Sequence, residues 1–293
     1  MANDRTQSIG ASDAYRAISM DTALWAEKCG LADPPNLDDQ ENVRWGKILE
    51  ATIAATFAED TGRKVEHNKK ADVTTHPERD FLTATLDAIQ IDPDKGIGAL
   101  ECKNVGEYLS SDWKEFPPLK FQVQLQHQLA VTGMPWGSLC ALIGGNRLRW
   151  FDMNRNERFI ERMIDKEAYF WTHVLDKIPP PVDGTLATEN ALKRLYATVD
   201  GATVMLPKFI DDPNGEPMDW DTELLSAKAT IKQNEEKRRW IENHLRAAMK
   251  TAEVGCVEGG ATYTLKSTTR HNPAREASTS TFRVLRRRGS KSN

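Results

Sequence analysis

The chain has 293 residues, 39% hydrophobic and 28% charged, a composition typical of globular proteins that excludes collagenous, low-complexity and wholly disordered chains. Its formal net charge of −4 at pH 7 argues against binding nucleic acid through bulk basic charge. No run of about 18 apolar residues is present to span a bilayer, and the N-terminal MANDRTQSIG lacks the apolar core of a secretory signal, so a cytoplasmic location is expected.

The first 60 residues predict two helices. One is expected over residues 9–28, with Ser12 or Asp13 as its N-cap. The second is expected over residues 41–60 and ends at Gly62. Apolar residues recur at every fourth position of this second helix, which predicts a stripe that faces the core.

The next hundred residues mix strands with helices. Strand-like segments at 81–86 and 98–103 flank the turn sequence Asp92-Pro93-Asp94-Lys95-Gly96, which predicts an antiparallel pair. The further elements expected are a helix at 119–132, a hairpin at 136–152 and a helix at 156–177. This order of elements predicts an α+β, or mixed α/β, architecture.

A domain boundary is predicted at Pro179-Pro180-Pro181, because this run cannot continue a helix and forms a stiff extended spacer. Residues 1–178 then form a core, and residues 179–220 form a linker with a short helix. Residues 221–293 are expected to hold a long helix that ends near residue 254, a short strand and a basic tail that contains Arg286-Arg287-Arg288.

Three acidic residues and a lysine stand out as candidate site residues. Asp87 follows a predicted strand, Glu101 and Lys103 project from one face of the next strand, and Cys102 points away. Glu50 borders the apolar stripe of the helix over 41–60, where a charge is costly unless it is compensated. Two carboxylates and a backbone carbonyl suit Mg²⁺ or Mn²⁺, and a lysine beside them suits phosphodiester hydrolysis. A Glu-x-Lys pair alone is more typical of an ordinary same-face ion pair on a solvated strand.

Four successive segments favour the catalytic interpretation. They are Trp45-Gly46-Lys47-Ile48-Leu49-Glu50, Ala84-Thr85-Leu86-Asp87, Gly98-Ala99-Leu100-Glu101-Cys102-Lys103, and Phe121-Gln122-Val123-Gln124-Leu125-Gln126-His127-Gln128-Leu129-Ala130-Val131-Thr132-Gly133. Over about residues 5 to 178 the chain resembles the YqaJ-type, lambda-exonuclease-like viral recombinases of the PD-(D/E)xK nuclease superfamily. The resemblance implies a restriction-endonuclease-like nuclease core, with a central mixed β-sheet flanked by helices, followed by a helical C-terminal extension.

The resemblance also implies a role for each matched residue. Lys103 is expected beside the attacking water, and Gln124 falls at the family's helical glutamine, which orients groups near that lysine. Gln128, one turn further along the same face, either supports Gln124 or is a helix-surface amide. His127 is interpreted as a helix-face histidine rather than a ligand. The metal ligands implied are Asp87, Glu101, the Cys102 backbone carbonyl and, at a second metal position, Glu50.

The segment from Ile9 to Ala14 resembles the start of this family's fold, where a serine and an upstream arginine hold the 5′-phosphate of a recessed strand. Ser12 and Arg5 match that spacing. A hydroxyl and backbone amides at a helix N-terminus form an anion site. The alternatives are that Ser12 only caps the helix and that Arg5 is a charge on a frayed end.

The activity implied is that of a Mg²⁺-dependent deoxyribonuclease, an exonuclease that resects linear double-stranded DNA from 5′ to 3′. The 3′ overhangs that remain would serve phage-type recombination with a single-strand annealing protein. The family's assembly is a homotrimeric ring threaded by DNA, and a phage or prophage gene acting in the bacterial cytoplasm is implied.

Three alternatives remain. They are an endonuclease, a Cas4-like end-trimming nuclease and a non-catalytic DNA-binding recombination module. The four cysteines, at positions 29, 102, 140 and 256, lack C-x-x-C spacing, so no iron–sulfur cluster of the Cas4 type is expected. The intact set of Asp87, Glu101, Lys103 and Glu50 argues against a non-catalytic module.

Overall fold

In a computed structural model of the chain, the structure describes residues 5–34, 40–68, 70, 72–196, 203–212, 214–258 and 260–266. These residues fall into two compact units, the first of which extends to residue 197 while the second begins at residue 198. Within the described ranges, none of the helices combines the length and the apolar character needed to cross a membrane.

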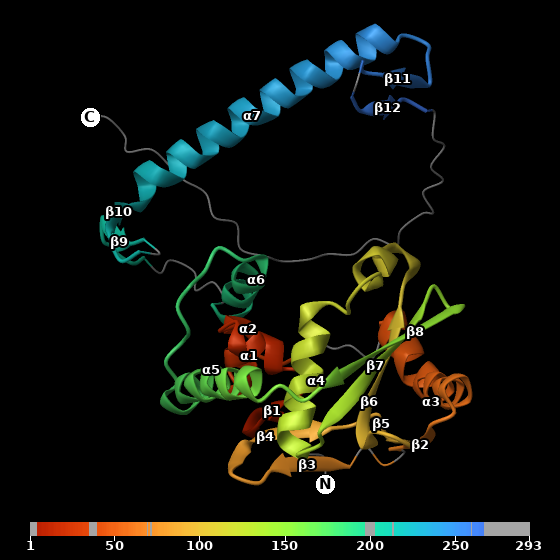
Figure 1. The fold of residues 1–293 in the computed structure, drawn as a ribbon. Helices are drawn as coiled ribbons and strands as arrows, with labels where there is room; N and C mark the ends of the chain where they lie inside the picture. Colours follow the sequence, from red (N-terminus) through yellow and green to blue (C-terminus); the bar gives the residue numbers. More distant parts are fainter. Residues whose placement is uncertain are drawn as a thin grey trace. The chain divides into compact units, whose positions relative to one another are not determined.

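A five-stranded mixed sheet is the centre of the first unit (Figure 1). In spatial order its strands are β2 (Lys64–His67), β5 (Ala88–Asp92), β6 (Gly96–Val105), β7 (Trp136–Ile143) and β8 (Arg147–Asn154). β6 and β7 run parallel, and the other neighbouring strands are antiparallel. The central strand β6 is buried from residue 98 to residue 102, as its small and apolar sequence predicts.

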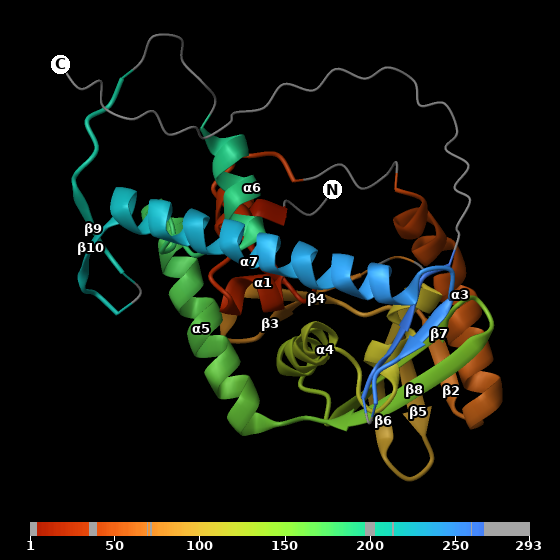
Figure 2. The same cartoon turned by 90° about the horizontal axis from the view of Figure 1, so that it is seen from above.

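Two helices cover opposite faces of this sheet (Figure 2). Phe57 of α3 packs in one cluster with Leu100, and Leu125 of α4 packs in another with Ala99. Because successive residues of a strand point to opposite faces, Glu101 lies on the α4 side together with Ala99. The helices concerned are α3 (Glu41–Thr61) and α4 (Leu119–Thr132).

A second, three-stranded sheet lies beside the first (Figure 1). Its strands, in spatial order, are β1 (Ile9–Gly10), β4 (Arg79–Thr85) and β3 (Val73–His76). β1 runs parallel to β4, and β3 runs antiparallel to it. The chain leaves β4 at Thr85 and enters β5 at Ala88, so Asp87 lies where the chain crosses from one sheet to the other.

The turn over residues 92–96 joins an antiparallel pair as predicted, but the first strand of the pair was assigned wrongly. β5 pairs with β6, whereas the predicted strand at 81–86 is mostly β4 of the other sheet. The ladder between β5 and β6 ends at Ala88 and Leu100. Beyond it the Asp87 carboxylate accepts the Cys102 N–H at 2.7 Å, a donor that a longer β5 would have paired.

The single helix predicted over residues 9–28 is also wrong. The segment contains β1, α1 (Ala14–Ile18) and α2 (Thr22–Lys28), and η1 (Arg5–Gln7) precedes them. The helix is interrupted because Met20 has a φ of 55° and Asp21 caps α2 by accepting a hydrogen bond from Leu24 N at 2.9 Å. Ser12 lies in the turn before α1 and is not its N-cap, a position that Asp13 holds without a side-chain cap bond.

The other helices and the hairpin of the first unit follow the prediction. Gly133 ends α4 with a φ of 72°, and the Asn156 side chain caps α5 by accepting a bond from Phe159 N. α6 packs against α2, so the first unit continues past the proline run. The elements are α5 (Glu157–Asp176), α6 (Leu186–Leu195) and the 3-10 helix η2 (Glu107–Trp113), which was not predicted.

The second unit contains the predicted long helix, α7 (Trp220–Met249), which has no buried residue. The Asp219 side chain caps it by accepting a hydrogen bond from Thr222 N. Two short hairpins flank the helix, where the sequence predicted only one strand. Their strands are β9 (Phe209–Asp211), β10 (Pro217–Asp219), β11 (Val254–Cys256) and β12 (Thr262–Thr264). The predicted basic tail lies outside the described residues.

Candidate active site

The Glu101 carboxylate is the centre of a buried polar cluster between β6 and α4. The residue is only 3% exposed. Its Oε1 accepts hydrogen bonds from Lys103 Nζ at 2.5 Å and from Gln124 Nε2 at 2.6 Å. Its Oε2 accepts a bond from Gln128 Nε2 at 2.5 Å. Three donors therefore compensate a charge that burial would otherwise make very costly.

This cluster follows from two local periodicities. Glu101 and Lys103 are two residues apart on a strand, so both side chains face α4. Gln124 and Gln128 are four residues apart on a helix, so both side chains face β6. The structure thus brings together the predicted Glu101, Lys103 and Gln124, and it places Gln128 in the cluster rather than on the helix surface.

Asp87 approaches the cluster from the crossing between the two sheets. Its Oδ2 accepts the Cys102 N–H at 2.7 Å. Burial raises the pKa of Asp87 to about 8, and the negative charges of Glu101 and Glu50 contribute to this rise. In an extended strand the N–H and the C=O of one residue point to the same edge, so the Cys102 carbonyl is directed to the edge that Asp87 occupies.

Lys103 is held as a cation beside these acids. Burial alone lowers the pKa of a lysine, but the adjacent Glu101 carboxylate more than offsets this effect, so the pKa of Lys103 is raised. The ammonium group also lies over the ring of Phe121, 5.0 Å from its centroid. The side chain is 21% exposed, which leaves it reachable from the solvent.

Glu50 lies on α3, on the other face of the sheet from Gln124. Its Oε1 is 2.8 Å from Nε2 of His67, a residue at the end of β2 that the sequence did not single out. Glu50 is close enough to Asp87 to contribute to the raised pKa of that carboxyl group. A lone histidine at the end of a predicted strand carries no signal that could have identified this contact.

The donor set fits a divalent metal ion. Two carboxylates and a backbone carbonyl are the hard oxygen ligands that such cations prefer. Burial, and after it the negative charge of Glu101, raise the pKa of Asp87, and a bound cation would favour the charged form of this carboxyl group. Within the described ranges no three acidic, histidine or cysteine side chains form a metal site by themselves, and Glu50, Asp87 and Glu101 are among the residues to which this applies.

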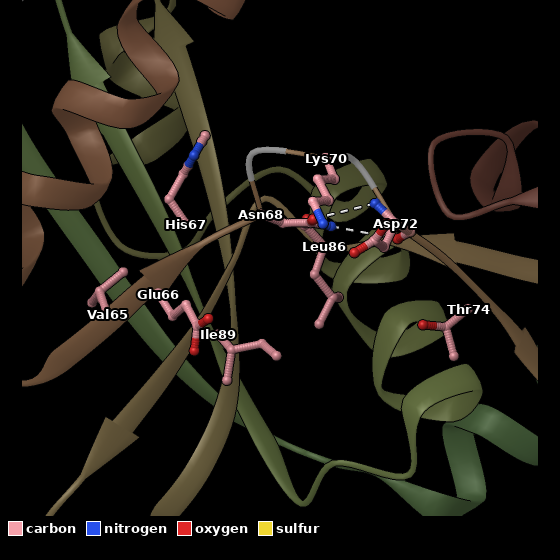
Figure 3. A pocket seen from close by; sticks show the side chains of 9 residues that line it. All are labelled: Val65, Glu66, His67, Asn68, Lys70, Asp72, Thr74, Leu86 and Ile89. Carbon is pink, nitrogen blue, oxygen red and sulfur yellow. Dashed lines mark hydrogen bonds between the residues drawn. The ribbon is translucent and has the colours of Figure 1, made fainter. Parts of the chain in front are cut away.

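A cavity of about 790 Å³ is lined by residues on both sides of the crossing, among them Leu86 and Ile89 (Figure 3). Asn68 shapes its wall, because its backbone N–H donates to the Asp87 carbonyl at 2.8 Å and its amide donates to the Leu86 carbonyl at 3.1 Å. The Asn68 side chain also bonds the backbone of Asp72. The residues that line the cavity are Val65, Glu66, His67, Asn68, Lys70, Asp72, Thr74, Leu86 and Ile89.

Ser12 lies in the turn that follows β1, which is an edge strand of the three-stranded sheet. β1 runs parallel to β4, with Gly10 opposite Thr83. Ser12 is the second residue after the end of β1, and Thr85 is the last residue of β4. The Ser12 residue is exposed, and the helix that follows it has only five residues. Arg5 is the first residue of η1.

His127 lies on the buried face of α4. Its side chain is fully buried, with Nδ1 2.7 Å from Glu167 Oε1 and Nε2 3.0 Å from the Thr83 carbonyl. Burial alone lowers the pKa of His127, but the Glu167 carboxylate reverses this and raises it. The pair ties α4 to α5, and no local pattern indicates a partner 40 positions away.

Comparisons with known proteins find a matching family model and a similar protein. Residues 2–135 match the family model of the YqaJ-like viral recombinase domain. The YqaJ protein of Bacillus subtilis (strain 168) is 29% identical over 263 residues, which are 87% of this chain and 79% of that protein. The matched range contains Glu50, Asp87, Glu101, Lys103 and both glutamines of the cluster.

Two solved structures are also similar. An alkaline exonuclease from Laribacter hongkongensis is 17% identical with a TM-score of 0.49, over 59% of this chain and 91% of that one. A phage-related exonuclease from Haemophilus somnus 129PT is 10% identical with a TM-score of 0.46, over 58% of this chain and 95% of that one.

Proposed function

We propose that the protein is a Mg²⁺-dependent DNA exonuclease, because residues 2–135 match the family model of the YqaJ-like viral recombinase domain. The observation that carries the proposal is the buried Glu101 carboxylate. It is held by Lys103 and Gln124, and it lies near enough to Asp87 to help raise the pKa of that residue to about 8. Such a concentration of charge in a partly buried place is costly for stability and typical of a catalytic site.

The residues proposed to hold the metal are Asp87, Glu101 and the Cys102 carbonyl, with Glu50 at a second position. A bound divalent cation polarises the scissile phosphate and makes water a better nucleophile. Lys103, a cation fixed against Glu101, orients the attacking water and offsets charge that develops on the phosphate. Gln124 keeps Glu101 in one rotamer, so that the lysine and the acid retain their relative positions.

The finer parts of the proposal concern the DNA. We propose 5′-to-3′ resection of linear duplex ends, which leaves 3′ overhangs for a single-strand annealing partner in phage-type recombination. A homotrimeric ring and a site of action in the bacterial cytoplasm belong to the same proposal. Ser12 is the proposed first contact with the 5′-phosphate, because it follows β1, which pairs with the strand β4 that precedes Asp87, and Arg5 is the proposed second contact.

The test uses linear duplex DNA labelled at either the 5′ or the 3′ end, with Mg²⁺ and with EDTA. We expect Mg²⁺-dependent release of mononucleotides from the 5′ end, and faster digestion of 5′-phosphorylated than of 5′-hydroxyl ends. Ser12→Ala should reduce this preference. Cleavage of closed circular duplex would indicate an endonuclease, and DNA binding without hydrolysis would indicate a non-catalytic module.

A further inference from the structure

Gln128 makes contacts that a surface amide or a packing residue would not need. Its side chain is fully buried in α4. Nε2 donates to Glu101 Oε2 at 2.5 Å and to the Thr85 carbonyl at 3.3 Å, so both hydrogens of the amide are directed to acceptors. Oε1 is buried without a hydrogen-bond partner. A buried acceptor without a donor costs stability, and this arrangement retains that cost in order to direct both donors at these two groups.

The two acceptors of Gln128 belong to the two segments that carry the proposed metal ligands. Glu101 is itself a ligand on β6, and Thr85 ends β4 two residues before Asp87. Lys103 and Gln124 both bond Oε1 of Glu101, whereas Gln128 bonds Oε2. Loss of Gln128 therefore leaves Oε2 of Glu101 without this hydrogen bond, so that the carboxylate can rotate. It also removes a link between β4 and β6.

We propose that Gln128 is a positioning residue, which fixes the Glu101 carboxylate and the segment before Asp87 at the separation that a divalent cation requires. This inference rests on the proposed function. Residues that orient metal ligands from behind commonly change metal affinity or activity by about 10- to 100-fold when they are replaced. Gln128 acts on the metal through Glu101, and it contacts neither the water nor the phosphate.

The same helix supplies a matched control. Gln126 is also buried, at 4% exposure, but it points away from the cluster. Its Nε2 donates to the Asn154 carbonyl at 2.8 Å, and its Oε1 accepts the Asn156 N–H at 3.0 Å. Replacement of either glutamine by methionine keeps the side-chain volume nearly constant and removes the hydrogen bonds. Of the two replacements, only that of Gln128 removes a hydrogen bond to Glu101.

The experiment compares the full-length protein with its Gln128→Met and Gln126→Met variants. Mn²⁺ binding is measured by calorimetric titration, and kcat and KM are measured on linear duplex DNA. For Gln128→Met we expect Mn²⁺ to bind about 10- to 100-fold more weakly. We also expect kcat to fall while the KM for DNA stays within about threefold, because the phosphate contacts are intact. Gln126→Met should bind Mn²⁺ as the parent protein does, even where it lowers the unfolding temperature.

Gln128→Asn serves as a second variant in case the methionine variant does not fold. It keeps the amide but is one methylene too short to reach Glu101, so the same loss of Mn²⁺ affinity is expected. The inference is wrong if the folded Gln128 variant binds Mn²⁺ within threefold of the parent protein, or if Gln126→Met weakens binding equally. A parent protein that neither binds Mn²⁺ nor hydrolyses DNA would instead refute the proposed function.

Discussion

Asp87→Asn should stabilise the metal-free protein. The pKa of Asp87 rises from 3.8 to about 8 on folding, mainly through burial and the Glu101 charge. The folded state therefore holds a proton that the unfolded state has lost between about pH 4 and pH 8, and the unfolding free energy falls as the pH rises through this window. At about 1.4 kcal/mol for each pH unit, the carboxyl group costs about 4 kcal/mol at pH 7 and less than about 2 kcal/mol at pH 5.

Asparagine stays neutral and can still accept the Cys102 N–H through its Oδ1. Urea unfolding in EDTA should therefore show the variant to be more stable than the parent at pH 7, with a smaller difference at pH 5. Mg²⁺ should stabilise the parent protein much more than the variant, since the variant lacks one ligand charge. A difference in stability between the variant and the parent that is absent at pH 7, or that grows as the pH falls, would refute the raised pKa of Asp87.

Three other outcomes are expected. Lys103→Met should abolish Mg²⁺-dependent hydrolysis while DNA affinity in a filter-binding assay stays within a few fold, and substantial residual turnover would contradict the role given to this lysine. Glu167→Gln should lower the unfolding free energy by about 3 kcal/mol, because it removes the negative charge that pairs with the buried His127. This loss should shrink as the pH rises through the raised pKa of His127, where the pair stops contributing stability, and a loss that grows with pH would count against an ion pair. A chain truncated after residue 196 should keep its nuclease activity on short duplexes. A chain truncated after Pro180 should be less stable than the one truncated after residue 196, because α2 loses its contact with α6. Equal unfolding temperatures of the two truncated chains would contradict this.

Much of the site could be predicted because it depends on short-range periodicity. Glu101 and Lys103 share a face of β6 by the two-residue repeat of a strand, and Gln124 has a fixed place in a helix with clear ends. The sequence did not decide whether Gln128 supports Gln124 or is an amide on the helix surface. Helical spacing predicts which face of the helix a residue occupies, but it does not predict whether that face is buried. His67 and the partner of His127 could not be foreseen, because each contact joins elements that are distant in the sequence.

The candidate residues for the chemistry, and most of the helices and turns that present them, follow from the sequence, since spacing, capping and glycine stop signals act within a few residues. Tertiary structure alone decided that the strand before Asp87 belongs to a second sheet, that residues 9–28 break into separate elements, and that Glu101 is buried beneath two glutamines. These outcomes depend on the competition of distant segments for the same hydrogen-bonding partners. The Cys102 N–H is an example, because it donates to the Asp87 side chain, in the crossing between the sheets, and not to the backbone of a neighbouring strand.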